Sequence, residues 1–161
     1  MKNAFNVEQQ KKLETIAALP ENLVALVGAL SEAQLKAEPP DGEWSVQQVV
    51  HHLADSHMNS FIRLKLILTE ENPPLKPYIE PLWAKTADVS DVPIAASLKL
   101  LEGLHERWVK LFASLDEAEL MRTGTHSELG RTLTPLDLLD IYAEHCEAHL
   151  EQIRRTLAAA I

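Results

Sequence analysis

The segment that decides the fold is the run at residues 134–157, TPLDLLDIYAEHCEAHLEQIRRTL. Its apolar side chains recur every three to four residues, which is the spacing of one face of an α-helix. Thr134 can cap that helix, with Pro135 at the first position and Asp137 at the third. The segment therefore predicts a long amphipathic helix that begins at Thr134 and ends near Leu157.

Two histidines of this helix are candidate metal ligands. On a wheel of about 100° per residue, His145 and His149 fall together on the flank of the apolar stripe, away from the charged side chains. They are one turn apart, so their rings can converge on one point. Histidines at this spacing often supply two of three protein ligands of a divalent metal, but such pairs also arise by chance. The helix does not fit a zinc protease, whose glutamate must follow the first histidine directly, where this chain has Cys146.

Two further helices are expected in the first half of the chain. One covers residues 7–30 and is interrupted or restarted at Pro20, because a proline inside a helix removes a hydrogen bond. The other covers residues 46–70 and begins with a capping box formed by Ser45 and Gln48. Both carry apolar residues at helical spacing, so each should pack one face against a common core.

A third helix in chain order should open at Asp91 or a close neighbour, with Pro93 in its first turn. Before it, residues 71–91 form a long proline-rich connection that we expect to cross over the end of the bundle. A second loop is expected at residues 123–130, and no segment has a convincing strand pattern. The four amphipathic helices predict an all-α fold, a four-helix bundle with long crossover connections.

Composition and charge limit the function. The chain has 161 residues, 46% hydrophobic and 24% charged, which predicts a single domain over residues 1–161. Its formal net charge of −9 is spread along the sequence, and no basic stripe is present, so nucleic acid is not an expected partner. No apolar run approaches the roughly 20 residues that cross a membrane. With no signal core and a single cysteine, we expect a cytoplasmic protein.

A third metal ligand must come from outside the last helix. The second helix offers His51, His52 and His57. The wheel places His57 in the middle of the apolar stripe, His52 toward its edge and His51 nearly opposite. His105 and His126 are further candidates. Spacing alone leaves this choice open.

Three stretches together carry a family resemblance. They are WSVQQVVHHLADSHMN at residues 44–59, HSELG at residues 126–130 and YAEHCEAHLEQI at residues 142–153. In this order and spacing they resemble the DinB/YfiT-like metalloenzymes, most closely the YfiT branch of metal-dependent hydrolases. The similarity covers nearly the whole chain.

The resemblance implies more than periodicity does. It implies an up-down-down-up bundle that often forms homodimers, with zinc or nickel in a site open to water. In this family the histidine directly before a leucine in the second helix binds the metal together with the H-x-x-x-H pair of the last helix. Carried over to this sequence, the implied metal ligands are His52, His145 and His149.

Such a site predicts a reaction class. A divalent ion held by three histidines can lower the pKa of bound water from about 15.7 toward 7, and we expect a metal-dependent hydrolase that acts on a small-molecule substrate. The same open position suits a thiol, so the alternatives are a metal-dependent thiol transferase acting with a low-molecular-weight thiol, or a non-catalytic metal-binding, stress-associated protein. Asp55, Asn59 and Tyr142 are candidates for proton transfer or for support of the ligands, with Asp55 as the candidate catalytic base.

Overall fold

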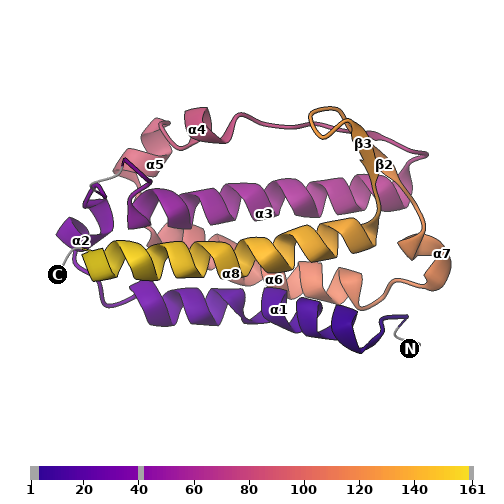
Figure 1. The fold of residues 1–161 in the computed structure, drawn as a ribbon, viewed down its shortest axis with the longest axis horizontal. Helices are drawn as coiled ribbons and strands as arrows, with labels where there is room; N and C mark the ends of the chain where they lie inside the picture. The colour runs from indigo at the N-terminus through magenta and orange to yellow at the C-terminus, as the bar shows by residue number, and fades with distance from the viewer. Residues whose placement is uncertain (1–3, 40–41, 160–161) are drawn as a thin grey trace.

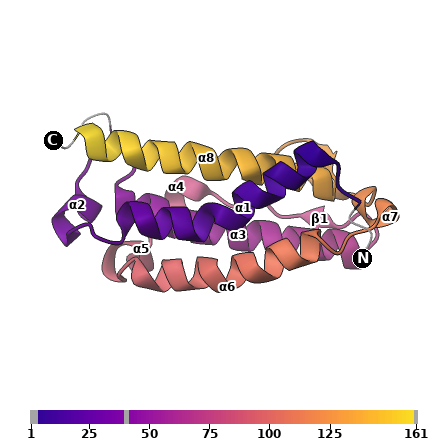
Figure 2. The same cartoon turned by 90° about the horizontal axis from the view of Figure 1, so that it is seen from below.

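Four long helices lie side by side in the computed structural model, which describes residues 4–39 and 42–159 (Figure 1). They are α1 (Val7–Val27), α3 (Val46–Thr69), α6 (Ala95–Phe112) and α8 (Pro135–Ala159). Figures 1 and 2 show that α1 and α8 run in one direction and that α3 and α6 run in the other. The four-helix bundle with up-down-down-up order is therefore confirmed. Among the described residues, no helix is both long and apolar enough to span a membrane.

Short elements occupy the connections between the long helices. They are α2 (Glu32–Lys36), β1 (Pro74–Leu75), α4 (Glu80–Trp83), α5 (Ala87–Asp91), α7 (Glu117–Leu120), β2 (Gly124–His126) and β3 (Arg131–Leu133). The connection from α3 to α6 carries β1, α4 and α5 (Figure 1). The long crossover is therefore present, but it runs along one side of the bundle and not over its end.

The three strands form a small sheet that the sequence did not predict. Its order is β1-β2-β3, with β1 parallel to β2 and β2 antiparallel to β3. Residues 123–130, expected as a loop, therefore include one strand of a hairpin. A Cβ added to Gly124 would lie 2.8 Å from a side-chain carbon of Leu75, so glycine permits the close approach of β1 and β2. Strands of two or three residues are too short to show an alternating pattern, which is why periodicity missed them.

The helix starts follow the capping residues closely. The backbone N–H of Gln48 donates to Ser45 Oγ, and Gln48 Oε1 accepts from the Ser45 N–H in return. In the same way, Thr134 N–H donates to Asp137 Oδ2 at 2.8 Å. Both predicted starts are confirmed.

Helix α6 begins later than expected. Asp91 ends α5 instead of opening the long helix, and α6 starts at Ala95. Between them, Val92 is extended, with φ of −95° and ψ of 131°. Pro93 disfavours the helical conformation for the residue before it, so the chain must leave one helix before it can begin the next.

Helix α1 continues through Pro20, so the expected interruption is wrong. Proline has no N–H, which leaves the carbonyl of Ile16, four residues earlier, without its helical donor. That carbonyl accepts a hydrogen bond of 2.7 Å from Nδ1 of His105 on α6. The helix tolerates the proline because a side chain of a neighbouring helix replaces the lost donor.

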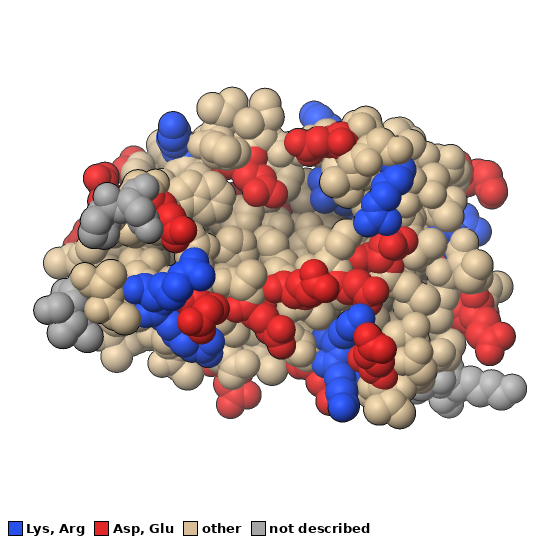
Figure 3. All heavy atoms as spheres, in the orientation of Figure 1, with Lys and Arg blue, Asp and Glu red and all other residues tan. Residues whose placement is uncertain are grey.

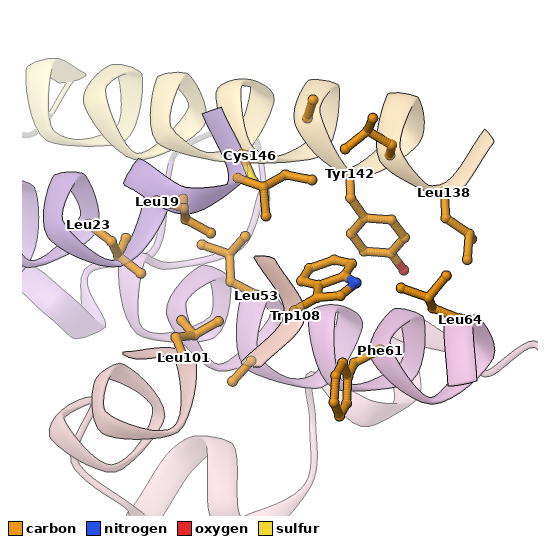
Figure 4. Close-up of a cluster of buried hydrophobic side chains, with 14 of the residues drawn as sticks. Leu19, Leu23, Leu53, Phe61, Leu64, Leu101, Trp108, Leu138, Tyr142 and Cys146 are labelled. Carbon is orange, nitrogen blue, oxygen red and sulfur yellow. The ribbon is translucent and has the colours of Figure 1, made fainter. Parts of the chain in front are cut away.

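The core is built mainly from leucine, valine and aromatic side chains of the four long helices. Figure 4 shows Leu53, Trp108 and Tyr142 meeting between α3, α6 and α8. Trp108 is fully buried, and its ring lies 5.4 Å from that of Tyr142, centroid to centroid. These apolar residues fill the interior of the bundle. The core therefore does not depend on hydrophobic contacts of the buried histidines.

Candidate metal centre

His52 of α3 and His145 and His149 of α8 bring their ring nitrogens together. Nε2 of His145 lies 3.2 Å from Nε2 of His52 and 3.2 Å from Nε2 of His149. Two nitrogens bound to one tetrahedral zinc ion at about 2.0–2.1 Å are separated by roughly 3.4 Å. Within residues 4–39 and 42–159, these side chains form the one group of three or more with metal-ligand spacing. The arrangement therefore fits a single divalent ion.

The three imidazoles are neutral at physiological pH. Burial, together with a smaller effect of the neighbouring His149, lowers the pKa of His52 to about 3. Burial also holds the pKa of His145 well below its usual value, and His149 and His52 add to the effect. For His149, burial again lowers the pKa. A neutral imidazole offers a lone pair, which is the state a metal requires.

Neighbouring side chains orient these rings. Gln152 Oε1 lies 2.7 Å from Nδ1 of His149, so the amide oxygen accepts the Nδ1–H and leaves Nε2 unprotonated. Trp44, directly before the cap of α3, packs its ring 4.8 Å from that of His52, centroid to centroid. Gln152 could have been predicted from the sequence, since it follows His149 by three residues on the same helix.

A cavity of about 190 Å³ adjoins His145. Its walls come from α3, α8, the β2–β3 hairpin and the crossover before α4, and include Ser56, Arg63, Tyr78, His126, Tyr142 and His145. On the face drawn in Figure 3, the surface is hollowed between α8 and the crossover, with acidic and basic side chains around the hollow. A larger hollow of about 400 Å³ lies near the start of α3, but it contains none of the three histidines.

Two hydroxyl groups line the cavity beside His145, those of Ser56 and Tyr142. Tyr142 O–H donates to the carbonyl of Ser56 at 3.1 Å, and Ser56 Oγ lies 3.3 Å from the Tyr142 oxygen. Ser56 Oγ is also 3.4 Å from Nε2 of His145. The structure therefore brings Tyr142 into contact with the site. Ser56, by contrast, could not be singled out from the sequence.

Arg63 places a buried guanidinium in the same cavity wall. It is 9% exposed, its Nη2 donates to the carbonyl of Lys76 at 2.7 Å, and its Nε has no hydrogen-bond partner among the described residues. Glu80 and Glu128 also line the cavity and are exposed. Arg63 stands among apolar residues of α3, and this was the signal that sequence reasoning missed.

Asp55 lies one turn after His52 on α3 and is half-buried. Burial raises the pKa of its carboxyl to about 6, and the charge of Asp88 on α5 contributes to the rise. The side chain of Asn59 donates to the carbonyl of Asp55 at 2.8 Å, so its amide is engaged with the helix backbone. Of these two candidates, only Asp55 has an ionisable side chain, which proton transfer requires.

The other histidines have separate roles. His57 is fully buried, and its two ring nitrogens contact His105 and His145. His51 was placed opposite the apolar stripe, yet it is 5% exposed and bonds to Ser97 Oγ and the Val92 carbonyl. The segment between α5 and α6 covers that side of α3. The helical wheel therefore wrongly suggested that His51 is exposed. His126 lies on β2 and lines the cavity without joining the three-histidine group.

Comparisons with known proteins show the family of the chain. A family model described as the DinB superfamily matches residues 15–153. A Bacillus mycoides (strain KBAB4) protein named "Putative metal-dependent hydrolase" is 42% identical over 149 residues, which are 91% of this chain and 86% of that protein. A Bacillus cereus (strain 03BB102) protein of the same description is 43% identical over 147 residues, 90% of this chain and 84% of that one.

A solved structure shares the fold. YfiT from Bacillus subtilis, described as a probable metal-dependent hydrolase with an unusual four-helix bundle topology, superposes with a TM-score of 0.89 at 36% identity. The match covers 97% of this chain and 90% of that one. At this coverage, the similarity extends over all four helices and the connections between them.

Proposed function

The chain belongs to the DinB superfamily, and on that premise we propose that it is a metal-dependent hydrolase of small molecules. The observation that carries the proposal is the convergence of three neutral imidazole nitrogens beside a polar cavity. Hydrolase names among the relatives, and the description of YfiT, support the same reaction class.

We propose His52, His145 and His149 as the ligands and zinc or nickel as the metal. Imidazole is a ligand of intermediate softness that suits both ions, and the site has no thiolate that would favour a softer one. When bound, such an ion acts as a Lewis acid that lowers the pKa of a coordinated water and polarises a carbonyl. The protein's own part is to hold the three nitrogens in place and to bind the substrate next to them.

Asp55 is the proposed proton acceptor. With a pKa of about 6, its carboxyl is mostly ionised at pH 7 yet more basic than an exposed aspartate, which suits a general base. It lies one turn from His52, the one proposed ligand on α3. In the cavity wall, Arg63 Nε, which has no partner in the described part of the chain, and the hydroxyls of Ser56 and Tyr142 can orient polar groups of a substrate.

The test is a metal-dependence assay on the full chain. Protein stripped with a chelator is reloaded with zinc or nickel and assayed with a panel of small esters and amides. We expect hydrolysis only after reloading, and none with His149→Ala under the same conditions. His51→Gln, which changes a buried histidine outside the site, should retain the activity.

Two outcomes would change the proposal. Hydrolysis that survives complete removal of metal would contradict it. Activity only with a low-molecular-weight thiol and an electrophile would replace the hydrolase with a metal-dependent thiol transferase, because the same open position can bind and ionise a thiol.

We also propose that the protein works in the cytoplasm as a homodimer and does not bind nucleic acid. The resemblance to the family supports the dimer, and the net charge of −9 disfavours contact with polyanions. Light scattering on the purified chain measures the assembly, and a monomer at micromolar concentration would contradict the dimer.

A further inference from the structure

We propose that His57 and His105 are positioning residues that fix the tautomer of His145 and hold its Nε2 toward the proposed metal. They form a continuous chain of hydrogen bonds that ends at the carbonyl freed by Pro20. The inference rests on the proposed metal site. It adds the two residues that orient one of the proposed ligands, His145.

The chain has three links. Nδ1 of His105 lies 2.7 Å from the carbonyl oxygen of Ile16. Nε2 of His105 lies 2.8 Å from Nδ1 of His57, and Nε2 of His57 lies 3.1 Å from Nδ1 of His145. It therefore runs from α1 through α6 and α3 to α8, and it connects all four long helices.

The terminal carbonyl sets the direction of every bond. A carbonyl only accepts, so Nδ1 of His105 carries the proton, and in a neutral imidazole the other nitrogen must then be an acceptor. His57 accordingly donates from Nδ1 and accepts at Nε2. His145 must donate from Nδ1, which leaves the lone pair of its Nε2 free, and this is the atom that faces His52 and His149.

Burial keeps the two middle rings neutral, as this assignment requires. It lowers the pKa of His105 to about 4, and it holds the pKa of the fully buried His57 well below its usual value. A second proton on either ring would leave two donors facing each other. Neutral rings satisfy all six nitrogens of the chain without conflict, counting the metal as the partner of Nε2 of His145.

The end of the chain also excludes a proton relay. The Ile16 carbonyl belongs to a buried residue and has no proton to release or take up. A purely hydrophobic role for His57 and His105 does not explain the two imidazoles either. Leucine would fill the same space, and it would bury no polar nitrogen that needs a hydrogen-bond partner. What remains is orientation of a metal ligand by a hydrogen bond to its second nitrogen, which typically changes metal affinity about 10- to 100-fold.

The experiment compares zinc affinity among single variants, using competition with a chromogenic chelator on the purified full chain. His57→Phe removes the acceptor for His145 and should weaken zinc binding about 10- to 100-fold. His57→Gln supplies an amide oxygen near the position of Nε2 and should recover most of that loss. The matched control is His51→Phe, which removes another buried, hydrogen-bonded histidine of the same helix and should leave the affinity unchanged.

A second measurement needs no variant. Nitrogen chemical shifts in the metal-free wild type should show His145, His57 and His105 all protonated on Nδ1. An Nε2–H tautomer at His145 would overturn the inference, and so would equal zinc affinity in His57→Phe and the wild type. Failure of the metal site itself would look different, because zinc affinity would then be unaffected by His145→Ala.

Discussion

Gln152 Oε1 accepts a hydrogen bond of 2.7 Å from Nδ1 of His149, one turn earlier on the same helix. This contact does for His149 what His57 does for His145: it places the proton on Nδ1 and leaves Nε2 free. Both histidines of α8 are therefore held ready for the metal by a hydrogen bond from Nδ1. For His149 this bond is local, and for His145 it belongs to a chain across the bundle.

The Gln152 contact can be tested by removing its oxygen. We expect Gln152→Leu to weaken zinc binding about tenfold, at the lower end of the usual range, because Gln152 is partly exposed and water can replace it. Gln152→Glu retains an oxygen acceptor and should bind zinc at least as tightly as the wild type. Chelator competition measures both, and identical affinities in the two variants would show that the hydrogen bond does not support the ligand.

The identity of the third ligand gives a stoichiometric prediction. His52→Ala should leave the purified protein with little metal, because Nε2 of His52 completes the group of three. His57→Gln should still bind one equivalent when zinc is in excess, since that ring contacts a ligand without facing the ion. Elemental analysis beside circular dichroism gives the result, and metal-free His57→Gln with metal-replete His52→Ala would reverse the assignment.

Pro20→Ala should change stability and metal affinity in opposite directions. Alanine restores an N–H to α1, and relief of an interior proline can stabilise a helix by up to about 3 kcal/mol. The new donor competes with His105 for the Ile16 carbonyl, so the histidine chain weakens and zinc affinity falls, by less than in His57→Phe. Thermal unfolding of the metal-free protein and zinc competition are the two readouts. A variant that is more stable and binds zinc as tightly as the wild type would separate Pro20 from the site.

Asp55 predicts a dependence of stability on pH. Its pKa is raised from 3.8 to about 6 in the folded protein, so the folded state binds this proton more tightly than the unfolded state does. The carboxylate therefore destabilises the fold increasingly as pH rises from about 4 to above 6. Relative to the wild type, Asp55→Asn should gain stability over that range, by about 1 kcal/mol once solvent screening is allowed for. Urea unfolding of metal-free protein at pH 4.5 and 7.5 measures the change.

The same substitution should reduce hydrolysis. If Asp55 accepts the proton, the wild-type rate rises through pH 6 as the carboxylate forms, and Asp55→Asn loses about 10²- to 10⁴-fold in kcat/KM. Zinc content should be unaffected, because the side chain is not one of the three proposed ligands. An unchanged pH profile in the variant would assign the base to another group.

The sequence by itself determined the four long helices, but not the three short strands. Apolar spacing located the four long helices, and the capping pairs Ser45–Gln48 and Thr134–Asp137 located the starts of two of them within a residue. The pairing of His145 with His149 could also be predicted from the sequence, because residues four apart on a helix are neighbours whatever surrounds the helix. The up-down-down-up order and the choice of His52 came from the family resemblance, not from periodicity.

Tertiary packing decided which side chains meet across helices. Periodicity could not separate His52 from His57, because the rotation of α3 about its axis relative to α8 sets which of the two rings reaches Nε2 of His145 and which reaches Nδ1. The burial of His51 likewise depends on the segment that crosses over α3. From the sequence, Pro20 predicted a break in a helix. The carbonyl that it frees belongs to Ile16, and it joins the hydrogen-bonded chain to the candidate metal centre only because His105 of α6, 89 residues away from Ile16, lies beside it. Such contacts join residues far apart in sequence, so no local pattern encodes them.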